Sequence, residues 1–229
     1  MYISGRLQLS FFSIALLISA YTYPKAIIQS RIHSCKDSCA ETSVATTDAL
    51  RTWIREARPD QVVQAYSVLF TYSPELAQSI PCLPPLGDWS GNRISSGFGV
   101  RTHPTLHTQR HHDGIDIAGP NQYVRAAASG QVEAVAYSRS LGRYVRVDHG
   151  NSYHTVYGHL ALQSVQVGQQ VRIGETLGIT GSTGRSTGVH LHYSVLKHNV
   201  PVNPADYLVL AIRFVNQYQQ QLRRVGKAQ

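Results

Sequence analysis

The sequence predicts a mainly β protein: an antiparallel β-sheet domain over residues 89–208, with a small helical region before it and a C-terminal helix after it. Three observations support this fold class. From Ile94 onward, short runs of alternating apolar and polar residues lie between glycine-rich turns, which is typical of antiparallel sheets. Between residues 48 and 70 the apolar residues recur at helical spacing instead. A cluster of prolines at residues 81–85 separates the two regions.

Residues 1–24 are predicted to be a signal peptide or an N-terminal membrane anchor. Arg6 precedes a mostly apolar stretch over residues 7–23, which is short for a membrane span of about 20 residues and fits a secretory signal better. Ile18-Ser19-Ala20 could end such a signal, and an uncleaved anchor in contact with the membrane is the alternative. In both cases we expect the residues after Pro24 to lie outside the cytoplasm, in the periplasm or cell envelope.

Residues 25–88 are predicted to form a helical region and a proline-rich linker. Apolar residues recur at helical spacing over residues 48–58, and Pro59 ends that segment. A second helix is predicted over residues 60–70, and the prolines and Gly87 then mark the linker. We interpret this region as a packing or spacer element. A docking surface for a partner is the alternative, although no motif supports it.

The three cysteines, Cys35, Cys39 and Cys82, all precede the predicted β domain. In an oxidising compartment one pair could form a disulfide and leave one cysteine over. A Cys35–Cys39 bridge requires a non-helical turn, because residues four apart on a helix have poor disulfide geometry. Pairing of Cys82 with either of them is the alternative, and the sequence does not distinguish these pairings. A cysteine metal site is not expected, because further cysteines at suitable spacing are missing.

The β domain is expected to contain at least seven strands, at residues 123–127, 130–136, 144–148, 153–159, 170–173, 176–180 and 190–196. Turns are predicted at His149-Gly150-Asn151, at Gly181-Ser182-Thr183-Gly184 and at His198-Asn199. Residues 204–224 predict the C-terminal helix, so that residues 209–229 comprise helix and a basic, polar tail.

The net charge of +8, from 21 Lys and Arg against 13 Asp and Glu, is consistent with an anionic partner such as nucleic acid, lipid headgroups or wall polymers. Nucleic-acid binding is not expected, because the basic residues are scattered and no recognition motif accompanies them. The sequence specifies no oligomeric state.

Two stretches carry the candidate chemistry, His112-Asp113-Gly114-Ile115-Asp116 and His190-Leu191-His192. Side chains alternate in extended backbone, so His112 and Asp116 are expected on one face, as are His190 and His192. Gly114 lies between the first two on their own face and adds no side chain there. Two imidazoles and a carboxylate, from His112, His192 and Asp116, around an open fourth position are the arrangement of a catalytic site for one zinc ion.

The His-x-His pair alone has little weight, since chance gives about 0.5 such pairs in a chain with 11 histidines among 229 residues. The surrounding motifs are far more specific. In order they are Ser96-Gly97-Phe98-Gly99 with Arg101 and His103-Pro104, the His112–Asp116 stretch, Tyr157-Gly158-His159-Leu160, and the run from Gly181 to His192. Over residues 93–208 this order and spacing resembles the lysostaphin-type (LytM-type) zinc metallopeptidases, which cut the peptide part of bacterial peptidoglycan. The resemblance implies the antiparallel, duplicated-hybrid-motif-like β fold of that family for residues 89–208.

The resemblance also implies that His159 and His190 are the non-ligand catalytic histidines, which activate the water and stabilise the transition state. Histidine suits proton transfer near neutral pH. His154 is an odd step from His159 along the strand, so it is expected to face away unless Gly158 makes a bulge. His111, next to His112, is also expected to face away. Four further histidines fall in turn-like sequence and receive no role: His103, His107, His149 and His198.

Residues 181–188 are expected to form a flexible loop that borders a substrate groove and precedes the His190 strand. Arg101 and Arg185 could bind peptide carboxylates in a bidentate manner, and a surface role is the alternative. Two positions depart from the family pattern: Asn121-Gln122-Tyr123 replaces a Gly-Thr-Pro-like turn, and Ser152 stands where glycine is common.

We therefore expect a secreted or membrane-tethered zinc endopeptidase that hydrolyses cross-links or stem peptides of bacterial peptidoglycan. A metal-binding but non-catalytic regulator of cell-wall hydrolases is the first alternative, and a peptidase for ordinary proteins is the second. Because all five metal and catalytic positions are filled, the active enzyme is preferred. The sequence does not specify which peptide bond is cleaved.

Overall fold

The structure, a computed structural model, describes residues 39–86, 93–102, 108–119 and 121–208. The chain divides into two compact units, residues 1–73 and residues 74–229. The predicted export segment, Cys35, His103 and His107 lie outside the described residues. Among the helices that are described, none is both long and apolar enough to cross a membrane.

The first unit contains two helices, α3 (Cys39–Glu56) and α4 (Pro59–Tyr72). Both were predicted, but α3 begins at Cys39 and not near Asp48, because its first turns carry no apolar periodicity to reveal them. Pro59 ends the first helix as expected and is also the first residue of the second, a position where the missing N–H of proline removes no helical hydrogen bond. The Gln61 side chain accepts a hydrogen bond from the Arg58 N–H at 2.8 Å and so helps to cap the N-terminus of α4.

The second unit begins with the short helix α5 (Pro74–Ala77), and the segment up to Leu86 packs as part of the β unit. The Leu83 N–H donates to the Ala127 carbonyl at 3.0 Å, and Leu86 forms a β-bridge with Val124. Cys82 within this segment is buried. The proline-rich residues 81–86, which the sequence assigned to a linker, thus contribute backbone hydrogen bonds and buried side chains to the β unit.

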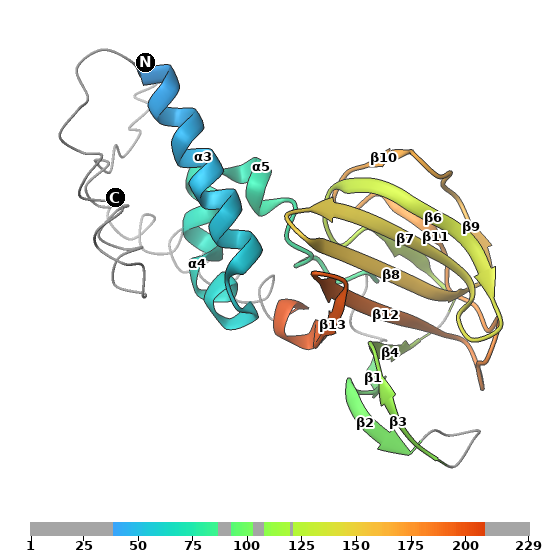
Figure 1. Cartoon of the computed structure of the whole chain (residues 1–229). Helices are drawn as coiled ribbons and strands as arrows, with labels where there is room; N and C mark the ends of the chain where they lie inside the picture. Colours follow the sequence, from blue (N-terminus) through green and yellow to red (C-terminus); the bar gives the residue numbers. More distant parts are fainter. Residues whose placement is uncertain (1–38, 87–92, 103–107, 120, 209–229) are drawn as a thin grey trace, which may run out of the picture. The chain divides into compact units, whose positions relative to one another are not determined.

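Thirteen strands lie in the described part of the chain, and they pair in the antiparallel direction. The large sheet has the order β1-β4-β12-β8-β7-β6-β10, with β13 also paired to β12. Its strands are β1 (Arg93–Ser96), β4 (Ile115–Ala118), β6 (Gly130–Ser138), β7 (Gly142–Gly150), β8 (Tyr153–Leu160), β10 (Gln170–Val171), β12 (His190–Lys197) and β13 (Val200–Val202). A small sheet contains β5 (Tyr123–Arg125), β11 (Thr176–Ile179) and β9 (Leu162–Gln163), and β2 (Gly99–Thr102) pairs with β3 (Gln109–His112) in a hairpin. Figure 1 shows β6, β7, β8 and β12 side by side and the hairpin next to β1 and β4.

The prediction of a mainly antiparallel β domain is confirmed, and each of the seven predicted strands is present within a few residues of its expected bounds. The sequence did not single out β1, β2, β3, β9 and β13. These strands are short, and β3 is mostly exposed and reads Gln-Arg-His-His, so it carries no alternation of apolar and polar residues.

The two faces of the large sheet differ in chemistry. On β12 the residues Leu191, Tyr193 and Val195 are fully buried in the core, together with Tyr153 and Tyr157 of β8. The alternate residues of β12 and β8 point to the opposite face, because side chains alternate along a strand. That opposite face carries His190, His192, Ser194 and Leu196 of β12, and Val156 of β8, which line a groove.

The turn between β7 and β8 has left-handed backbone. Asn151 and Ser152, between β7 and β8, have φ values of 50° and 66°. This conformation favours glycine, so the serine that departs from the family pattern occupies a glycine-like position. After β13, the Asn203 side chain accepts a hydrogen bond from the Ala205 N–H at 3.1 Å and caps a helix that begins at Pro204. The rest of the predicted C-terminal helix, residues 209–224, and the basic tail lie outside the described residues.

Candidate metal centre

The three predicted metal ligands come from three strands. His112 is the last residue of β3, Asp116 lies in β4, and His192 lies in β12, where it is paired directly with Asp116. His112 and Asp116 were expected on one face of a strand or loop. Their side chains do meet, but through a bend of the chain at Asp113 and Gly114 between β3 and β4. A Cβ at Gly114 would collide with the Tyr193 carbonyl oxygen and the Ser194 hydroxyl. Glycine therefore lets the bend approach β12 closely enough to bring the two side chains together.

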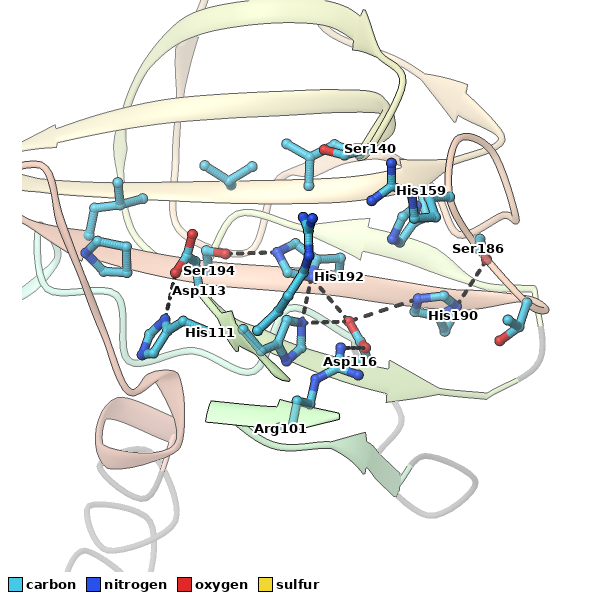
Figure 2. Close-up of a pocket in the computed structure, with 18 residues that line it drawn as sticks. Arg101, His111, Asp113, Asp116, Ser140, His159, Ser186, His190, His192 and Ser194 are labelled. Carbon is cyan, nitrogen blue, oxygen red and sulfur yellow. Dashed lines mark hydrogen bonds and ion pairs between the residues drawn. The ribbon is translucent and has the colours of Figure 1, made fainter. Parts of the chain in front are cut away.

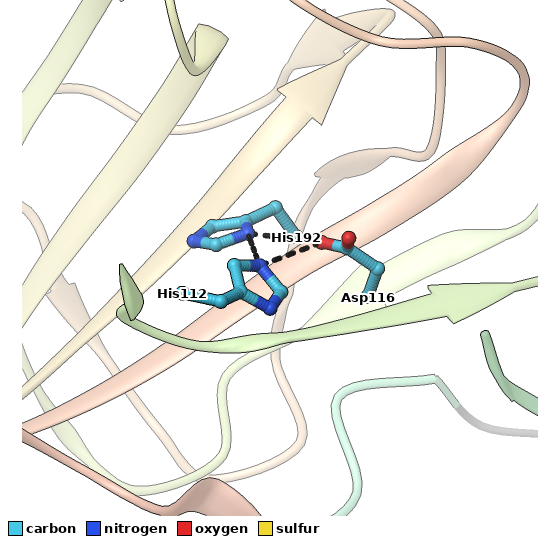
Figure 3. Close-up of side chains that lie close together, drawn as sticks. All are labelled: His112, Asp116 and His192. Carbon is cyan, nitrogen blue, oxygen red and sulfur yellow. Dashed lines mark hydrogen bonds and ion pairs between the residues drawn. The ribbon is translucent and has the colours of Figure 1, made fainter. Parts of the chain in front are cut away.

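The donor atoms of the three side chains converge on one point (Figure 3). His112 Nε2 lies 3.1 Å from His192 Nδ1 and 3.2 Å from Asp116 Oδ1. His192 Nδ1 lies 3.0 Å from the same oxygen. The two histidines are only 9% and 8% exposed, so little water reaches their facing nitrogens.

The outward nitrogen of each histidine has its own partner. His112 Nδ1 lies 2.7 Å from the Gly97 carbonyl oxygen, which can only accept, so the proton of the neutral ring sits on Nδ1. His192 Nε2 lies 2.9 Å from the Ser194 hydroxyl, which can accept the proton of that nitrogen. In these tautomers both facing nitrogens present a lone pair toward the third donor, the carboxylate of Asp116. Metal-ligating histidines are oriented by such outer hydrogen bonds.

Asp116 is held from two sides. Its Oδ1 faces the two histidines, and its Oδ2 accepts from Arg101 Nη2 of β2 at 3.3 Å. Burial raises the pKa of the Asp116 carboxyl, but the hydrogen bonds and charges of His112 and His192 lower it further than burial raises it. The net pKa is well below the usual range, so this group is a carboxylate at neutral pH.

This donor set fits a metal ion. Two lone pairs and a carboxylate oxygen within 3.2 Å of one another repel unless a cation lies between them. Bonds of about 2.0–2.1 Å at tetrahedral angles would place ligand atoms about 3.3 Å apart, close to the separations found here. In the described part of the chain, His112, Asp116 and His192 are the residues whose ligand atoms lie close enough together to hold one metal ion.

His190 lies beside this centre on the groove face of β12. Its Nδ1 lies 2.8 Å from the Gly188 carbonyl oxygen and 3.2 Å from the Ser186 hydroxyl. Its Nε2 lies 3.8 Å from Asp116 Oδ1. The carbonyl holds the proton on Nδ1, so Nε2 presents a lone pair near the metal centre.

His159 reaches the same place from β8 through a β-bulge. The register between β7 and β8 shifts next to Gly158 and His159, and His159 has a left-handed φ of 61°. Its Nδ1 lies 2.7 Å from the Thr183 carbonyl oxygen, and its ring centroid lies 4.6 Å from that of His190. Burial lowers the pKa of His159 to about 4. Left-handed backbone at a residue other than glycine is strained, and such strain is commonly found at functional sites.

The bulge also determines where His154 lies. It inserts one residue into β8, so His154 and His159 share the groove face despite their odd spacing, as the sequence analysis allowed for a bulge at Gly158. His154 Nδ1 lies 3.1 Å from Glu133 Oε2, away from the metal centre.

The five predicted site residues lie together in one groove with a cavity volume of about 460 Å³ (Figure 2). The β2–β3 hairpin, which precedes β4, forms one wall. The turn at Ser140 and the loop of residues 181–188, on the side of β7 and β8, form the other wall. Figure 2 shows Arg101 and Ser140 on opposite sides of His192.

The loop of residues 181–188 is anchored to neighbouring strands, although the sequence analysis expected a flexible loop. The Arg185 N–H donates to the Ser140 carbonyl at 3.0 Å, and the Arg143 N–H donates to the Thr183 hydroxyl at 3.0 Å. Gly184 has a φ of 74°, and a Cβ there would collide with the backbone of Gly142. The glycines thus permit close docking of the loop.

Several site residues were not identified from the sequence. Ser194 and the carbonyl groups of Gly97, Thr183 and Gly188 orient the four histidines. Ser194 could have been found, because it lies two residues after His192 on the same strand face. The carbonyl groups carry no sequence signal.

Two further histidines differ from expectation. His111 was expected to face away, but it lies at the rim of the groove with its Nδ1 2.7 Å from Asp113 Oδ1. His149 was placed in a turn, but it is a buried residue of β7 whose ring nitrogens contact the Ser129 carbonyl and the Thr155 hydroxyl.

Comparison with known proteins identifies the domain that holds this site. Residues 110–204 match the model of peptidase family M23. A DD-carboxypeptidase/endopeptidase of Neisseria meningitidis is 49% identical over 115 residues, which are 50% of this chain and 26% of that protein. A peptidoglycan DD-endopeptidase of Vibrio cholerae is 40% identical over 114 residues, which are 49% of this chain and 26% of that protein. The match thus spans about a quarter of the length of these relatives.

A solved structure described as the SpoIIQ-SpoIIIAH pore-forming complex contains a chain with a TM-score of 0.50 and 26% identity, covering 56% of this chain and 90% of that chain. The family match covers the strands that hold the candidate metal centre. The chain therefore carries a peptidase family M23 domain over residues 110–204.

Proposed function

We propose that this protein is a zinc-dependent endopeptidase that hydrolyses peptide cross-links or stem peptides of bacterial peptidoglycan outside the cytoplasm. The observation that carries the proposal is the convergence of His112, Asp116 and His192 around one point, with two further histidines beside them. The name of the Vibrio cholerae relative, a peptidoglycan DD-endopeptidase, supports peptidoglycan as the substrate.

The donor set favours zinc among the metals that proteins hold. Two imidazole nitrogens and one carboxylate oxygen, with a fourth position open, are typical of catalytic zinc sites, whereas magnesium and calcium sites consist of oxygen ligands. One zinc ion held by His112 Nε2, His192 Nδ1 and Asp116 Oδ1 would supply Lewis acidity, which lowers the pKa of a water and polarises a scissile carbonyl.

His159 and His190 handle the protons in this proposal. Both rings commit Nδ1 to a backbone carbonyl, so both offer Nε2 as a proton acceptor. One of these nitrogens accepts the proton when the water oxygen forms its bond to the carbonyl carbon. A proton then passes to the departing amine nitrogen as the C–N bond breaks. The same pair, once protonated, can donate a hydrogen bond to the oxyanion that develops.

The groove suits an extended peptide strand, because its two walls leave a channel across β12 with the metal centre in its floor. The DD-endopeptidase activity named for the Vibrio cholerae relative favours a peptide bond between two D-configured centres as the one cleaved. Cleavage of direct cross-links between stem peptides is therefore the form of the proposal that we test.

The test uses the full chain loaded with zinc, incubated with purified sacculi, and mass spectrometry of the released muropeptides. We expect cross-linked fragments to give way to monomers. Chelation of the metal, or the substitution His112→Ala, should abolish the release, whereas His198→Ala in the turn after β12 serves as the matched histidine control.

Release that persists in the chelated protein would overturn the zinc mechanism. If the protein holds zinc and retains its fold but releases nothing, the regulator of cell-wall hydrolases becomes the better interpretation. Digestion of casein but not of sacculi would support a peptidase for ordinary proteins instead.

A further inference from the structure

The charged residues of the groove are unequally paired. Its acidic side chains both have partners: Asp116 contacts the two ligand histidines and Arg101, and Asp113 contacts His111 at 2.7 Å. Its cationic side chains are Arg101, Arg110 and Arg185. Arg101 is compensated by Asp116. Arg110 and Arg185 make no side-chain hydrogen bond or ion pair within the described part of the chain. The groove beside the metal centre therefore carries two uncompensated guanidinium groups.

Arg110 stands in a position that a stable hairpin would avoid. It lies directly opposite Arg101 in the register of β2 and β3. Like charges at directly opposite positions destabilise an antiparallel pair. The pair is also two residues from His112, at the mouth of the metal centre. Because Asp116 compensates Arg101, the pair keeps one unpaired positive charge, on Arg110, at the edge of the groove, where a bound anion could compensate it.

Arg185 projects from an anchored backbone on the other wall. Its N–H donates to the Ser140 carbonyl at 3.0 Å, and Gly184 before it packs against Gly142. Ser186 after it contacts His190 Nδ1 at 3.2 Å. The backbone at Arg185 is thus held next to His190, one of the two proposed catalytic histidines. The position of the Arg185 Cα relative to the metal centre is therefore fixed.

We infer that Arg110 and Arg185 are two carboxylate-binding positions, one on each wall, that select acidic peptides with a carboxylate on each side of the scissile bond. This inference rests on the proposed function and names the substrate class that the site prefers. Stem peptides that are cross-linked directly carry such carboxylates, whereas a glycine bridge has no charged side chain.

Arginine suits this role because its planar guanidinium binds a carboxylate through two parallel hydrogen bonds. Both side chains are exposed in the peptide-free protein, so a bound strand would bury the ion pairs and strengthen them. Binding on both walls would place the peptide across β12, with its scissile carbonyl over the metal centre between the two arginines.

The test measures peptide binding to the full chain loaded with zinc by isothermal titration calorimetry. The probes are a synthetic cross-linked pair of stem peptides with a carboxylate on each side of the bond, two analogues in which one or the other carboxylate is a carboxamide, and pentaglycine. The proteins are the wild type, Arg110→Gln, Arg185→Gln and the control Arg172→Gln, whose side chain is exposed and outside the groove.

We expect the wild type to bind the diacid about 10-fold more tightly than either amide, as the loss of one charge-assisted hydrogen bond predicts. Each groove variant should lose this discrimination at one carboxylate and keep it at the other, while Arg172→Gln behaves as the wild type. Equal binding of diacid and amides by the wild type, tighter binding of pentaglycine, or unchanged discrimination in both groove variants would overturn the inference.

Cleavage of the diacid, followed by mass spectrometry in the same samples, separates this inference from the proposed function. The expected binding pattern without cleavage would contradict only the proposed peptidase activity. Cleavage without discrimination between acid and amide would contradict only the role of the two arginines.

Discussion

Replacement of Ser194 by alanine should weaken zinc binding without disturbing the fold. The Ser194 hydroxyl lies 2.9 Å from His192 Nε2, on the outward side of the ring. When His192 Nδ1 binds a metal, the proton of the neutral ring must sit on Nε2, where the serine accepts it. Without metal, Nδ1 can hold the proton and donate it to Asp116 Oδ1, 3.0 Å away. In that second tautomer the serine hydroxyl can donate to the Nε2 lone pair, but only in the metal-binding tautomer does a buried N–H depend on the serine as its acceptor.

The expected magnitude follows from burial. His192 and Ser194 are 8% and 5% exposed, so water cannot readily replace the lost hydroxyl. A buried N–H without an acceptor costs about 1–3 kcal/mol. Because the cost falls mainly on the metal-bound tautomer, the dissociation constant for zinc should rise about 10–100-fold, the usual range for loss of an outer partner of a ligating histidine.

Competition with a chromophoric zinc chelator measures this constant directly. Ser164→Ala is the matched control, because Ser164 is exposed and lies outside the groove. Circular dichroism of the zinc-free proteins checks that the fold is intact. An affinity of Ser194→Ala within twofold of the wild type would refute the reasoning and leave Asp116 as the group that sets the tautomer of His192.

Three further predictions concern stability and assembly of the site. Gly114→Ala should lose zinc binding and destabilise the domain by more than about 2 kcal/mol, because its Cβ would collide with β12. Gly97→Ala has open space at its Cβ and should be tolerated. Equal zinc affinities in the two variants would contradict the steric argument. Tyr193→Phe should leave stability unchanged or raise it by about 1 kcal/mol in urea unfolding, because the buried Tyr193 hydroxyl has no partner among the described residues. Tyr157→Phe should lower stability by a similar amount, because the Tyr157 hydroxyl accepts from a buried backbone N–H at 2.8 Å, and a reversed order of the two would be incompatible with this hydrogen bonding. Burial lowers the pKa of His149 from 6.5 to about 4, so between these pH values the unfolded chain binds more protons than the folded protein. The free energy of unfolding is therefore unaffected by His149 above pH 6.5. It decreases as the pH falls toward 4, by at most about 3 kcal/mol. His149→Gln should remove this part of the pH dependence of unfolding, and an unchanged slope would assign it to other groups.

The strands of the β domain could be predicted because their signal is local. Residues 153–157 and 190–196 alternate between side chains for the core and side chains for the opposite face, and that alternation is visible in the sequence. The hairpin of β2 and β3 could not be predicted in this way. Its residues are largely exposed and polar, so no burial pattern marks them, and its position depends on pairing within the tertiary structure.

The role of residues 74–86 was equally hidden. Prolines normally indicate a linker, and here they lie in a segment whose backbone hydrogen-bonds to residues near β5. A proline-rich segment without regular structure satisfies its polar groups through partners distant in sequence, and a local pattern cannot reveal those partners.

By itself the sequence determined the mainly β class, the identity of the three candidate ligands and the pair of histidines beside them, because motif spacing and strand alternation are properties of neighbouring residues. Only the tertiary structure decided how those residues meet. The bend at Gly114 depends on the closeness of β12, and the bulge that turns His159 into the groove depends on its register with β7. The groups that orient the four histidines are three backbone carbonyls and one hydroxyl, which the fold brings to them from other segments. Backbone groups are the same at every residue, so their role is set by position in space and not by the amino-acid sequence around them.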